Sequence, residues 1–220
     1  MQINPVTRSK DAARRAYDRL SGIYDLLAGS SEKPLSKLGL QMLAIKKGEQ
    51  VLEIGCGTGK ALAWIAEQVA DEGYVHGLDL STGMLHQAMR RLAKMGCAGR
   101  SVLLEGDGAL LPYRENSFNA IFLSFTLELF DTPEISSVLS ECVRVLRSGG
   151  RLGVVAMHKP ARPNRIIRLY EWFHKHYPAY ADCRPIHAGD LVRNAGFTLE
   201  KQAIKSMWGL PVEILVARKP

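Results

Sequence analysis

The sequence contains little cysteine, and this scarcity excludes two kinds of small-protein architecture. Four cysteines occur among 220 residues, and they stand singly at positions 56, 97, 142 and 183 with no CxxC pair. A disulfide framework or a structural zinc site needs paired or closely spaced cysteines. No cluster of histidine and aspartate occurs either. The sequence therefore predicts no bound metal and a reducing compartment, the cytoplasm.

Long hydrophobic runs are also missing. The longest, residues 120–130, is shorter than the roughly 20 residues that span a bilayer, and it contains Glu128. The first fifteen residues, MQINPVTRSKDAARR, are polar and lack the apolar centre of a signal peptide. We therefore expect neither a targeting segment nor a membrane-spanning helix.

Acidic residues are outnumbered, with 29 basic residues against 22 acidic ones and a net charge of +7. The basic excess gathers in residues 8–19 and 159–175. A solvated surface explains most excesses of this size, and the functional alternatives are an anionic substrate, an anionic membrane surface and nucleic acid. No RNA-binding motif or recognition helix occurs, so we expect no nucleic-acid partner. Peripheral membrane contact stays open, and the sequence indicates no oligomeric state.

Short apolar strands alternate with helices from residue 51 onward. Strands are expected at 51–56, 74–80, 101–107, 119–125 and 151–158, and helices at 60–70, 83–95 and 133–146. Strands this rich in Val, Ile and Leu, alternating with helices, predict a parallel sheet covered on both faces. The closing runs 197–208 and 211–219 predict a hairpin, which makes the last strand antiparallel.

Helices flank this central part. Amphipathic spacing predicts a helix over 9–28 that breaks near Ser21-Gly22, and a second over 34–46. Further helices are expected at 164–176 and 188–195. No repeat, low-complexity segment or long linker interrupts the chain, so we expect a single domain.

The segment VLEIGCGTG, residues 51–59, runs from a buried strand through a glycine-rich turn into a helix. Its three glycines, at 55, 57 and 59, let the backbone approach a ligand, and the helix N-terminus favours an anionic group. A dinucleotide fingerprint would need a third glycine at position 60, where the sequence has Lys60. The G-x-G-x-G register, preceded by Glu53, therefore disfavours a nicotinamide-dependent oxidoreductase.

Acidic residues accompany the ends of three successive strands. Asp79 ends the second strand, where a carboxylate can accept hydrogen bonds from both ribose hydroxyls of a nucleoside. A helix N-cap is the alternative role, and the nearby glycine turn favours ribose binding. Asp107, in Gly-Asp-Gly after the third strand, can accept from an adenine amino group or can simply form a turn. Together with Glu53, these residues mark the edge of the sheet where open α/β folds bind ligands.

Three segments, VLEIGCGTG, GLDLSTGML and GDGALLPYRENSFNAIFLSFTLELF, resemble the class I S-adenosylmethionine-dependent methyltransferases. The sequence is most similar to the ubiquinone/menaquinone-biosynthesis C-methyltransferases (methyltransferase type 11), over residues 12–218. This resemblance implies S-adenosyl-L-methionine as the cofactor. It also implies a Rossmann-like α/β fold with a seven-stranded sheet, mostly parallel with an antiparallel last strand, helices on both faces and an N-terminal helical cover.

The resemblance further divides the single domain, residues 1–220. It implies an N-terminal helical cover over 1–47, a cofactor-binding core over 48–158, and substrate-side helices with the closing hairpin over 159–220. The cofactor contacts that it implies are Glu53, Gly55, Gly57, Gly59, Asp79, Leu80, Met84, Asp107, Gly108, Ser124 and Tyr24. Tyr17 belongs to the same cover, on the substrate side, although core packing explains either tyrosine equally well.

Two residues are candidates for a catalytic base. Methylation of a phenolic ring requires one because the pKa of a phenol is roughly 10, whereas a neutral amine needs none. His158 is the first candidate, since it follows the fifth strand, and Glu128 after the fourth strand is the second. Asp182 and Arg184 are candidates for orienting an anionic or hydroxyl-bearing acceptor, and a salt bridge that fixes their loop is the alternative.

The sequence thus predicts an S-adenosylmethionine-dependent methyltransferase that acts on a small, lipophilic acceptor. A quinol-like ring carbon or oxygen and a lipid amine are the acceptors considered, and a lipid acceptor would suit peripheral membrane contact by the helix at 164–177. The alternative is a non-catalytic S-adenosylmethionine-binding protein that retains the fold. The complete set of glycines and acidic residues disfavours that alternative.

Overall fold

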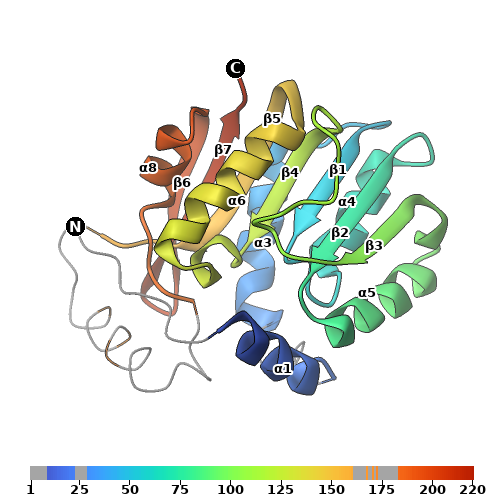
Figure 1. Ribbon diagram of the computed structural model, residues 1–220, viewed down its shortest axis with the longest axis horizontal. Helices are drawn as coiled ribbons and strands as arrows, with labels where there is room; N and C mark the ends of the chain where they lie inside the picture. The colour runs from blue at the N-terminus through green and yellow to red at the C-terminus, as the bar shows by residue number, and fades with distance from the viewer. Residues whose placement is uncertain (1–8, 23–28, 161–166, 168–169, 171, 173–182) are drawn as a thin grey trace.

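The structure is a computed structural model that describes residues 9–22, 29–160, 167, 170, 172 and 183–220. Its centre is a seven-stranded sheet in the order β3-β2-β1-β4-β5-β7-β6 (Figure 1). The strands are β1 (Gln50–Ile54), β2 (Tyr74–Asp79), β3 (Ser101–Glu105), β4 (Phe118–Ser124), β5 (Leu146–Met157), β6 (Thr198–Met207) and β7 (Leu210–Arg218). Strands β1 to β5 pair in parallel, and β7 runs antiparallel to both β5 and β6. The predicted fold class is confirmed.

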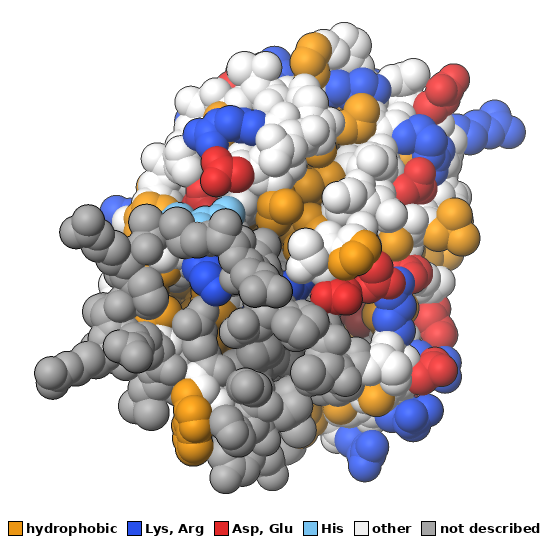
Figure 2. Space-filling model, turned by 60° about the vertical axis from the view of Figure 1, so that its left-hand side comes forward, with side chains coloured by type: hydrophobic (Ala, Val, Ile, Leu, Met, Phe, Trp, Pro, Cys, Tyr) orange, Lys and Arg blue, Asp and Glu red, His pale blue; other side chains and the backbone are white. Residues whose placement is uncertain are grey.

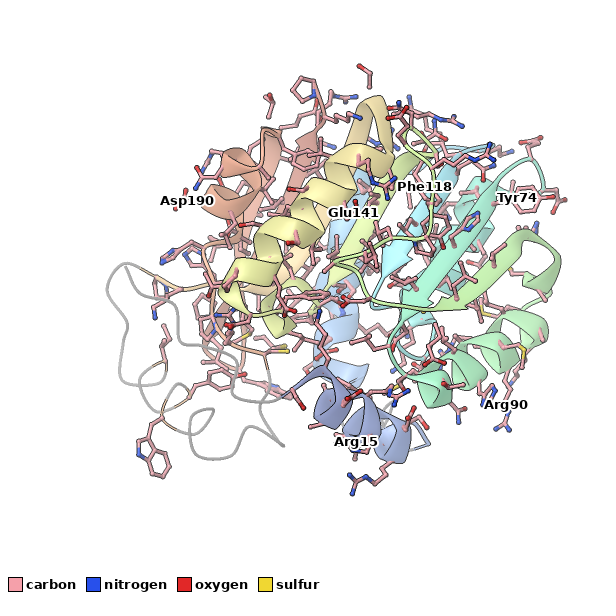
Figure 3. The ribbon with its side chains drawn as sticks, in the orientation of Figure 1. Arg15, Tyr74, Arg90, Phe118, Glu141 and Asp190 are labelled. Atoms are coloured by element: carbon pink, nitrogen blue, oxygen red, sulfur yellow. The ribbon has the colours of Figure 1, made fainter. Side chains whose placement is uncertain are left out.

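Helices cover both faces of the sheet, and each face has its own hydrophobic cluster. Helices α3 (Gly29–Leu43), α4 (Lys60–Val69) and α5 (Thr82–Lys94) pack on one face, and α6 (Thr132–Val145) and α8 (Ala188–Asn194) on the other. Consecutive strand residues alternate between the clusters, as Val51 and Leu52 do, because side chains of a strand point to opposite faces. Phe118 lies between the layers, whereas Arg15, Arg90 and Asp190 point outward (Figure 3).

Most element boundaries lie close to the predicted ones, and the differences have local causes. Helix α3 begins at Gly29, five residues before the start at 34 that amphipathic spacing predicted, and it contains Pro34. Strand β5 begins at Leu146, which pairs with Phe118, and a register shift between Phe118 and Ala120 accommodates the additional residues. The predicted closing hairpin is confirmed as β6 and β7. Most of the helix expected at 164–176, and residues 23–28 of the first, lie outside the described residues.

Helix α1 (Lys10–Leu20) lies across the carboxyl ends of the strands rather than on a face of the sheet (Figure 1). None of its side chains is buried, and it contacts α5. Asp18 holds it in place, because its carboxylate accepts hydrogen bonds from the Ser81 hydroxyl at 2.6 Å and the Gly83 amide at 3.0 Å. These two donors also hold the pKa of Asp18 below its ordinary value. Polar contacts therefore fasten α1 over the ends of the strands.

The close approach of α4 to α5 gives a first testable prediction. Gly59 has φ +76°, and a Cβ atom there would lie 2.8 Å from the Ala88 Cβ and 2.9 Å from its Cα. A left-handed backbone costs a non-glycine residue about 1–2 kcal/mol, and overpacking costs about 1–3 kcal/mol. We expect Gly59→Ala to lower the free energy of unfolding by about 2 kcal/mol or more, measured by urea denaturation.

Gly99→Ala is the matched control, since a Cβ atom at Gly99 meets no heavy atom within 4 Å and its φ is not positive. A surface change of this kind shifts stability by at most about 0.5 kcal/mol. Equal free energies of unfolding for the two variants would show that α4 and α5 can move apart to admit the added methyl group without loss of stability.

Candidate functional site

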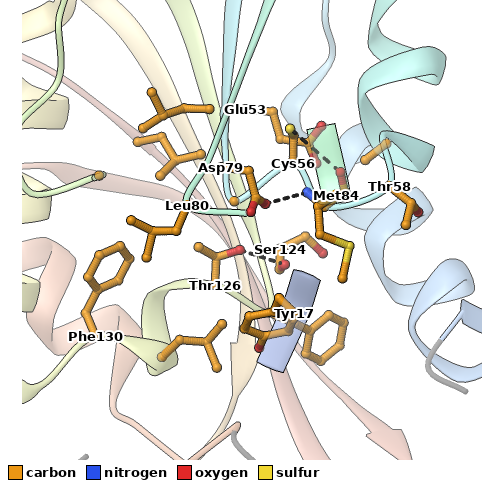
Figure 4. A pocket seen from close by; sticks show the side chains of 18 of the residues that line it. Tyr17, Glu53, Cys56, Thr58, Asp79, Leu80, Met84, Ser124, Thr126 and Phe130 are labelled. Carbon is orange, nitrogen blue, oxygen red and sulfur yellow. Dashed lines mark hydrogen bonds between the residues drawn. The ribbon is translucent and has the colours of Figure 1, made fainter. Parts of the chain in front are cut away.

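A cavity of about 610 Å³ opens at the carboxyl ends of β1, β2 and β4, beneath α1. The glycine turn and the strand ends form one part of its wall, and helices α1, α3 and α4 form another (Figure 4). The loop after β4 closes the remaining side with apolar residues, among them Phe125, Leu129 and Phe130. The cavity therefore joins the predicted cofactor edge to segments from the N-terminal quarter of the chain.

The glycine turn takes the shape that its sequence predicts. Gly55, Gly57 and Gly59 all have positive φ, where a side chain would strain the backbone. A Cβ atom on Gly55 would also collide with the Thr126 side chain. The Gly57 amide donates to the Asp79 carboxylate at 2.8 Å, which ties the turn to the end of β2. Asp79 thus has a structural contact in addition to the predicted ligand contact.

Asp79 is not the N-cap of the following helix. Ser81 has that role, because its hydroxyl accepts the Met84 amide at 3.1 Å. The Asp79 carboxylate instead accepts the Ser81 amide at 2.9 Å, and the side chain lines the cavity with Leu80 and Met84. Burial raises the pKa of Asp79, and its backbone hydrogen bonds oppose that shift.

Glu53 is the most strongly perturbed carboxyl group of the cavity. It is 3% exposed, and its Oε2 atom has no hydrogen-bond partner within the described residues. Burial raises the pKa of Glu53 well above its ordinary value, and the charge of nearby Asp79 raises it further. A buried carboxyl group and the half-buried carboxyl group of Asp79, lining one cavity, favour a ligand that offers a cation and hydrogen-bond donors.

Lys10 joins α1 to the far end of the cavity. Its ammonium group lies 2.5 Å from the Asp107 Oδ2 and 2.6 Å from the Glu134 Oε1, and 5.9 Å from the centre of the Phe130 ring. Asp107 also accepts the Ala109 amide at 2.9 Å, so both of its oxygens are engaged. Sequence reasoning missed Lys10, because the periodicity of a short helix does not show which strand ends it covers.

Hydroxyl groups line the centre of the cavity, where β4 meets α3. The Ser124 Oγ lies 2.7 Å from the Ser36 Oγ. The Ser36 hydroxyl also donates a hydrogen bond to the Glu32 carbonyl at 3.1 Å. The Thr126 hydroxyl donates to the Ser124 carbonyl at 3.1 Å (Figure 4). The sequence pointed to Ser124 through its place at a strand end, whereas Ser36 and Thr126 carried no recognisable signal.

The structure brings most of the predicted cofactor residues together. Those that line the cavity, with the predicted substrate residue Tyr17, are Glu53, Gly55, Gly57, Asp79, Leu80, Met84, Gly108 and Ser124. Gly59 and Asp107 do not line it: Gly59 is the N-cap residue of α4, and Asp107 is bound to Lys10. Tyr24 and Asp182 lie outside the described residues, so their predicted roles stay predictions.

The two predicted bases do not line this cavity. Glu128 is fully buried, and its Oε1 accepts the Met157 amide at 3.0 Å. His158 lines a much smaller cavity, where its Nδ1 lies 3.2 Å from the Glu213 Oε2, beside His187. Their position after strands β4 and β5 was predicted correctly, but both side chains turn away from the cofactor edge. A catalytic role for either residue stays a prediction that this placement does not support.

Arg184 is fully buried and supports the cavity without lining it. Its guanidinium donates to the carbonyls of Glu128 and Phe130 and to the Thr132 hydroxyl. These contacts hold the segment 128–132, of which Leu129, Phe130 and Asp131 line the cavity. The loop-fixing role considered in the sequence analysis describes this arrangement better than direct contact with an acceptor. No group of three or more metal-ligating side chains occurs within the described residues.

Comparison with known proteins identifies the family. A methyltransferase-domain family matches residues 51–150. The chain is 31% identical over 166 residues to a demethylmenaquinone methyltransferase of Lactobacillus johnsonii, covering 75% of this chain and 65% of that protein. It is 32% identical over 165 residues to a 2-phytyl-1,4-naphtoquinone methyltransferase of Synechococcus elongatus, covering 73% of this chain and 69% of that protein. The match thus spans less than two thirds of the first relative.

Two solved structures share the fold at low sequence identity. The [4+2]-cyclase SpnF has a TM-score of 0.77 at 19% identity, covering 100% of this chain and 99% of that one. A Burkholderia thailandensis 1,6-didemethyltoxoflavin-N1-methyltransferase, solved with 1,6-didemethyltoxoflavin and S-adenosylhomocysteine, has a TM-score of 0.70 at 19% identity, covering 99% and 94%. The chain belongs to the class I S-adenosylmethionine-dependent methyltransferases, whose cofactor is S-adenosyl-L-methionine. The predicted family and cofactor are confirmed.

The burial of Glu53 gives a prediction about stability. Because the folded chain disfavours the ionised carboxylate, the folded state holds more protons than the unfolded state above the ordinary pKa of 4.5. Stability therefore falls as the pH rises from 4.5 towards the raised pKa. Glu53→Gln removes this loss, and we expect a higher melting temperature of the ligand-free protein at pH 7, measured by scanning calorimetry.

The same substitution should weaken cofactor binding, because glutamine carries no charge. The gain in melting temperature should shrink as the pH is lowered below 4.5, where wild-type Glu53 is protonated in both states. A Glu53→Gln protein that is less stable than the wild type at pH 7 would contradict the assignment of Glu53 as a buried, disfavoured carboxylate.

Proposed function

We propose that this chain transfers the methyl group of S-adenosylmethionine to a small, lipophilic acceptor. The acceptors considered are a quinol-like ring carbon or oxygen and a lipid amine. The observation that carries the proposal is the pair of carboxyl groups, buried Glu53 and half-buried Asp79, that line the cavity at the glycine turn. Membership of the methyltransferase family and the names of the two curated relatives support it.

The residues of the cavity fit S-adenosylmethionine. The Oε2 of Glu53 is available to accept a hydrogen bond from the amino group of the methionine part. Asp79 can accept from the ribose hydroxyls while keeping its bond from Gly57, because each carboxylate oxygen accepts more than one hydrogen bond. Leu80 and Met84 offer the apolar contacts that an adenine ring needs, and the open backbone at Gly57 admits the ligand closely.

The chain's contribution to the reaction is orientation and exclusion of water. When bound, the cofactor supplies an electrophilic methyl group on a sulfonium, so the protein needs to align an acceptor atom behind that methyl. Helix α1 covers the cavity through Ala13 and Tyr17, which limits the access of water. The hydroxyl pair Ser36 and Ser124 lies at the junction between the cofactor end and the α3 side of the cavity.

No histidine lines the described wall of the cavity, so no histidine there can remove a proton from the acceptor. Among its acidic residues outside the cofactor end, Asp131 caps α6 and Glu134 is bound to Lys10. An acceptor that arrives as a neutral amine or an ionised phenol needs no base from the protein. The proposal therefore assigns no proton transfer to His158 or Glu128.

We also propose the division of the chain into a cover over 1–47, a cofactor core over 48–158 and an acceptor-side part over 159–220. Helix α1 and the cavity it covers support the first two parts.

No helix of the described residues is long and apolar enough to cross a membrane. On the face drawn in Figure 2, acidic and basic side chains are mixed, so its visible described surface offers no large basic patch. Brief contact with a membrane remains part of the proposal only for a lipid acceptor.

Substitution of Asp79 tests the cofactor site. Asp79→Ala leaves two ribose hydroxyls unpaired, which should weaken binding of S-adenosylmethionine by at least about 2 kcal/mol, or roughly 30-fold. Calorimetric titration measures the change. Asp79→Asn separates ligand contact from the support of Gly57, since the amide oxygen can still accept one backbone hydrogen bond.

Unchanged affinity for S-adenosylmethionine in both Asp79 variants would show that Asp79 supports Gly57 and does not contact the cofactor. The wild-type protein should bind S-adenosylmethionine and S-adenosylhomocysteine with micromolar affinity and should not bind NAD. Formation of S-adenosylhomocysteine that depends on an added acceptor then tests transfer itself. Binding without any turnover across the acceptor classes would support the non-catalytic alternative.

A further inference from the structure

The face of α3 that lines the cavity is unusually basic for a helix packed on a sheet. Lys33, Ser36, Lys37 and Leu40 line the cavity, at spacings of three, four and seven residues from Lys33, and so they form one stripe of the helix. Only Leu40 of this stripe reaches the hydrophobic cluster. Lys33 and Lys37 are exposed at the rim, and the described residues provide no ion-pair partner for either.

Helix α4 adds a third lysine to the same cavity. Lys60, Ala61 and Trp64 line it from the first turns of α4, and α3 and α4 contact each other. Lys60 is the first residue of a ten-residue helix, so the backbone amides beside it add partial positive charge. We call the stretch formed by Lys33, Lys37 and Lys60, with Trp64 and Leu40, the α3–α4 wall.

The lysines of the cavity all come from helices, whereas Glu53 and Asp79 come from strand ends. Glu53 and Asp79 lie at the cofactor end, and the α3–α4 wall holds three lysines against one acidic neighbour, Glu32. S-Adenosylmethionine itself carries a sulfonium, an ammonium and one carboxylate, and that carboxylate can occupy at most one of the lysines. The bound cofactor would thus leave positive charge on the α3–α4 wall that its single carboxylate does not offset.

From this arrangement we propose that the α3–α4 wall is an anion subsite for the acceptor. The acceptor of the proposed reaction carries a carboxylate or phosphate group, which Lys33 and Lys37 bind, and an apolar ring that packs on Trp64. This inference rests on the proposed function and narrows it, because a cationic lipid amine would be repelled by the same wall. Both lysines sit at the open rim, so the attraction weakens as the salt concentration rises.

Binding of paired probes to the protein saturated with S-adenosylhomocysteine tests the subsite. The probes are 1-hydroxy-2-naphthoate, its neutral methyl ester, 1-naphthyl phosphate and the cationic 1-naphthylmethylamine. A charge-assisted hydrogen bond should make the wild-type protein bind the carboxylate about tenfold more tightly than the ester. Comparison of 1-naphthyl phosphate with 1-hydroxy-2-naphthoate shows which anion the subsite prefers. The cationic amine should bind more weakly than the neutral ester.

The double variant Lys33→Gln/Lys37→Gln should lose this preference and keep its affinity for S-adenosylhomocysteine. Lys60 stays intact because it adjoins the glycine turn. The control Lys94→Gln/Lys205→Gln removes the same charge from two exposed lysines outside the cavity and should retain the preference. Raising the salt concentration should reduce the preference in the wild type and the control alike.

Three results would overturn the subsite. They are equal affinity of the wild type for acid and ester, no binding of either anionic probe, and a preference that survives in the double variant. Each is read on protein shown to bind S-adenosylhomocysteine, so failure of the subsite differs from failure of the proposed function. A protein that does not bind S-adenosylhomocysteine at all would refute the proposed function first.

Discussion

The hydrogen bond from the Gly57 amide to the Asp79 carboxylate is the contact on which the site depends. It joins the turn after β1 to the end of β2, and the amides of Gly55 and Cys56 reinforce the junction by donating to the Leu78 carbonyl. The turn can follow this path only with positive φ at its glycines. Because α4 starts at the end of the turn, the same junction sets where α4 meets α5 and where its first residues enter the cavity.

Cofactor binding and stability make opposite demands on Glu53. Its carboxyl group is buried among apolar strands, where the charged form is disfavoured, and the described chain provides no donor for its Oε2. A ligand that brings an ammonium group would relieve that unfavourable state, and this relief would add to its affinity. Asp79 differs, because two backbone amides already stabilise its carboxylate. The two carboxyl groups are thus prepared for their ligands in different ways.

The fold could be predicted from the sequence, and most of the predicted cofactor residues line one cavity, because periodicity and chain order determine where the strand ends meet. Their individual roles came from the family resemblance. Glycines and acidic residues at the carboxyl ends of parallel strands meet at one edge wherever the strands pair. His158 and Glu128 also follow strands, yet their side chains bond to Glu213 and to the Met157 backbone, partners that depend on tertiary packing. The order of elements along the chain predicts which backbone segments lie at the carboxyl edge of the sheet. It does not predict the direction in which a side chain such as that of His158 points.

The helix that contains Lys10 was predicted from its amphipathic spacing, and α3 was predicted from residue 34 onward, but the contribution of these helices to the site was not predicted. A stripe of polar residues on a helix is ordinarily the solvent face, so lysines on α1 and α3 carried no signal in the sequence. In the structure, α1 crosses the strand ends and α3 turns part of one stripe towards the cavity. The cavity therefore has Glu53 and Asp79 at the strand ends and Lys33 and Lys37 on α3, an arrangement that suits the proposed cationic cofactor and anionic acceptor. A cationic cofactor and the proposed anionic acceptor would then bring opposite charges to the carboxyl groups and to Lys33 and Lys37, for which the described residues provide no ion-pair partner.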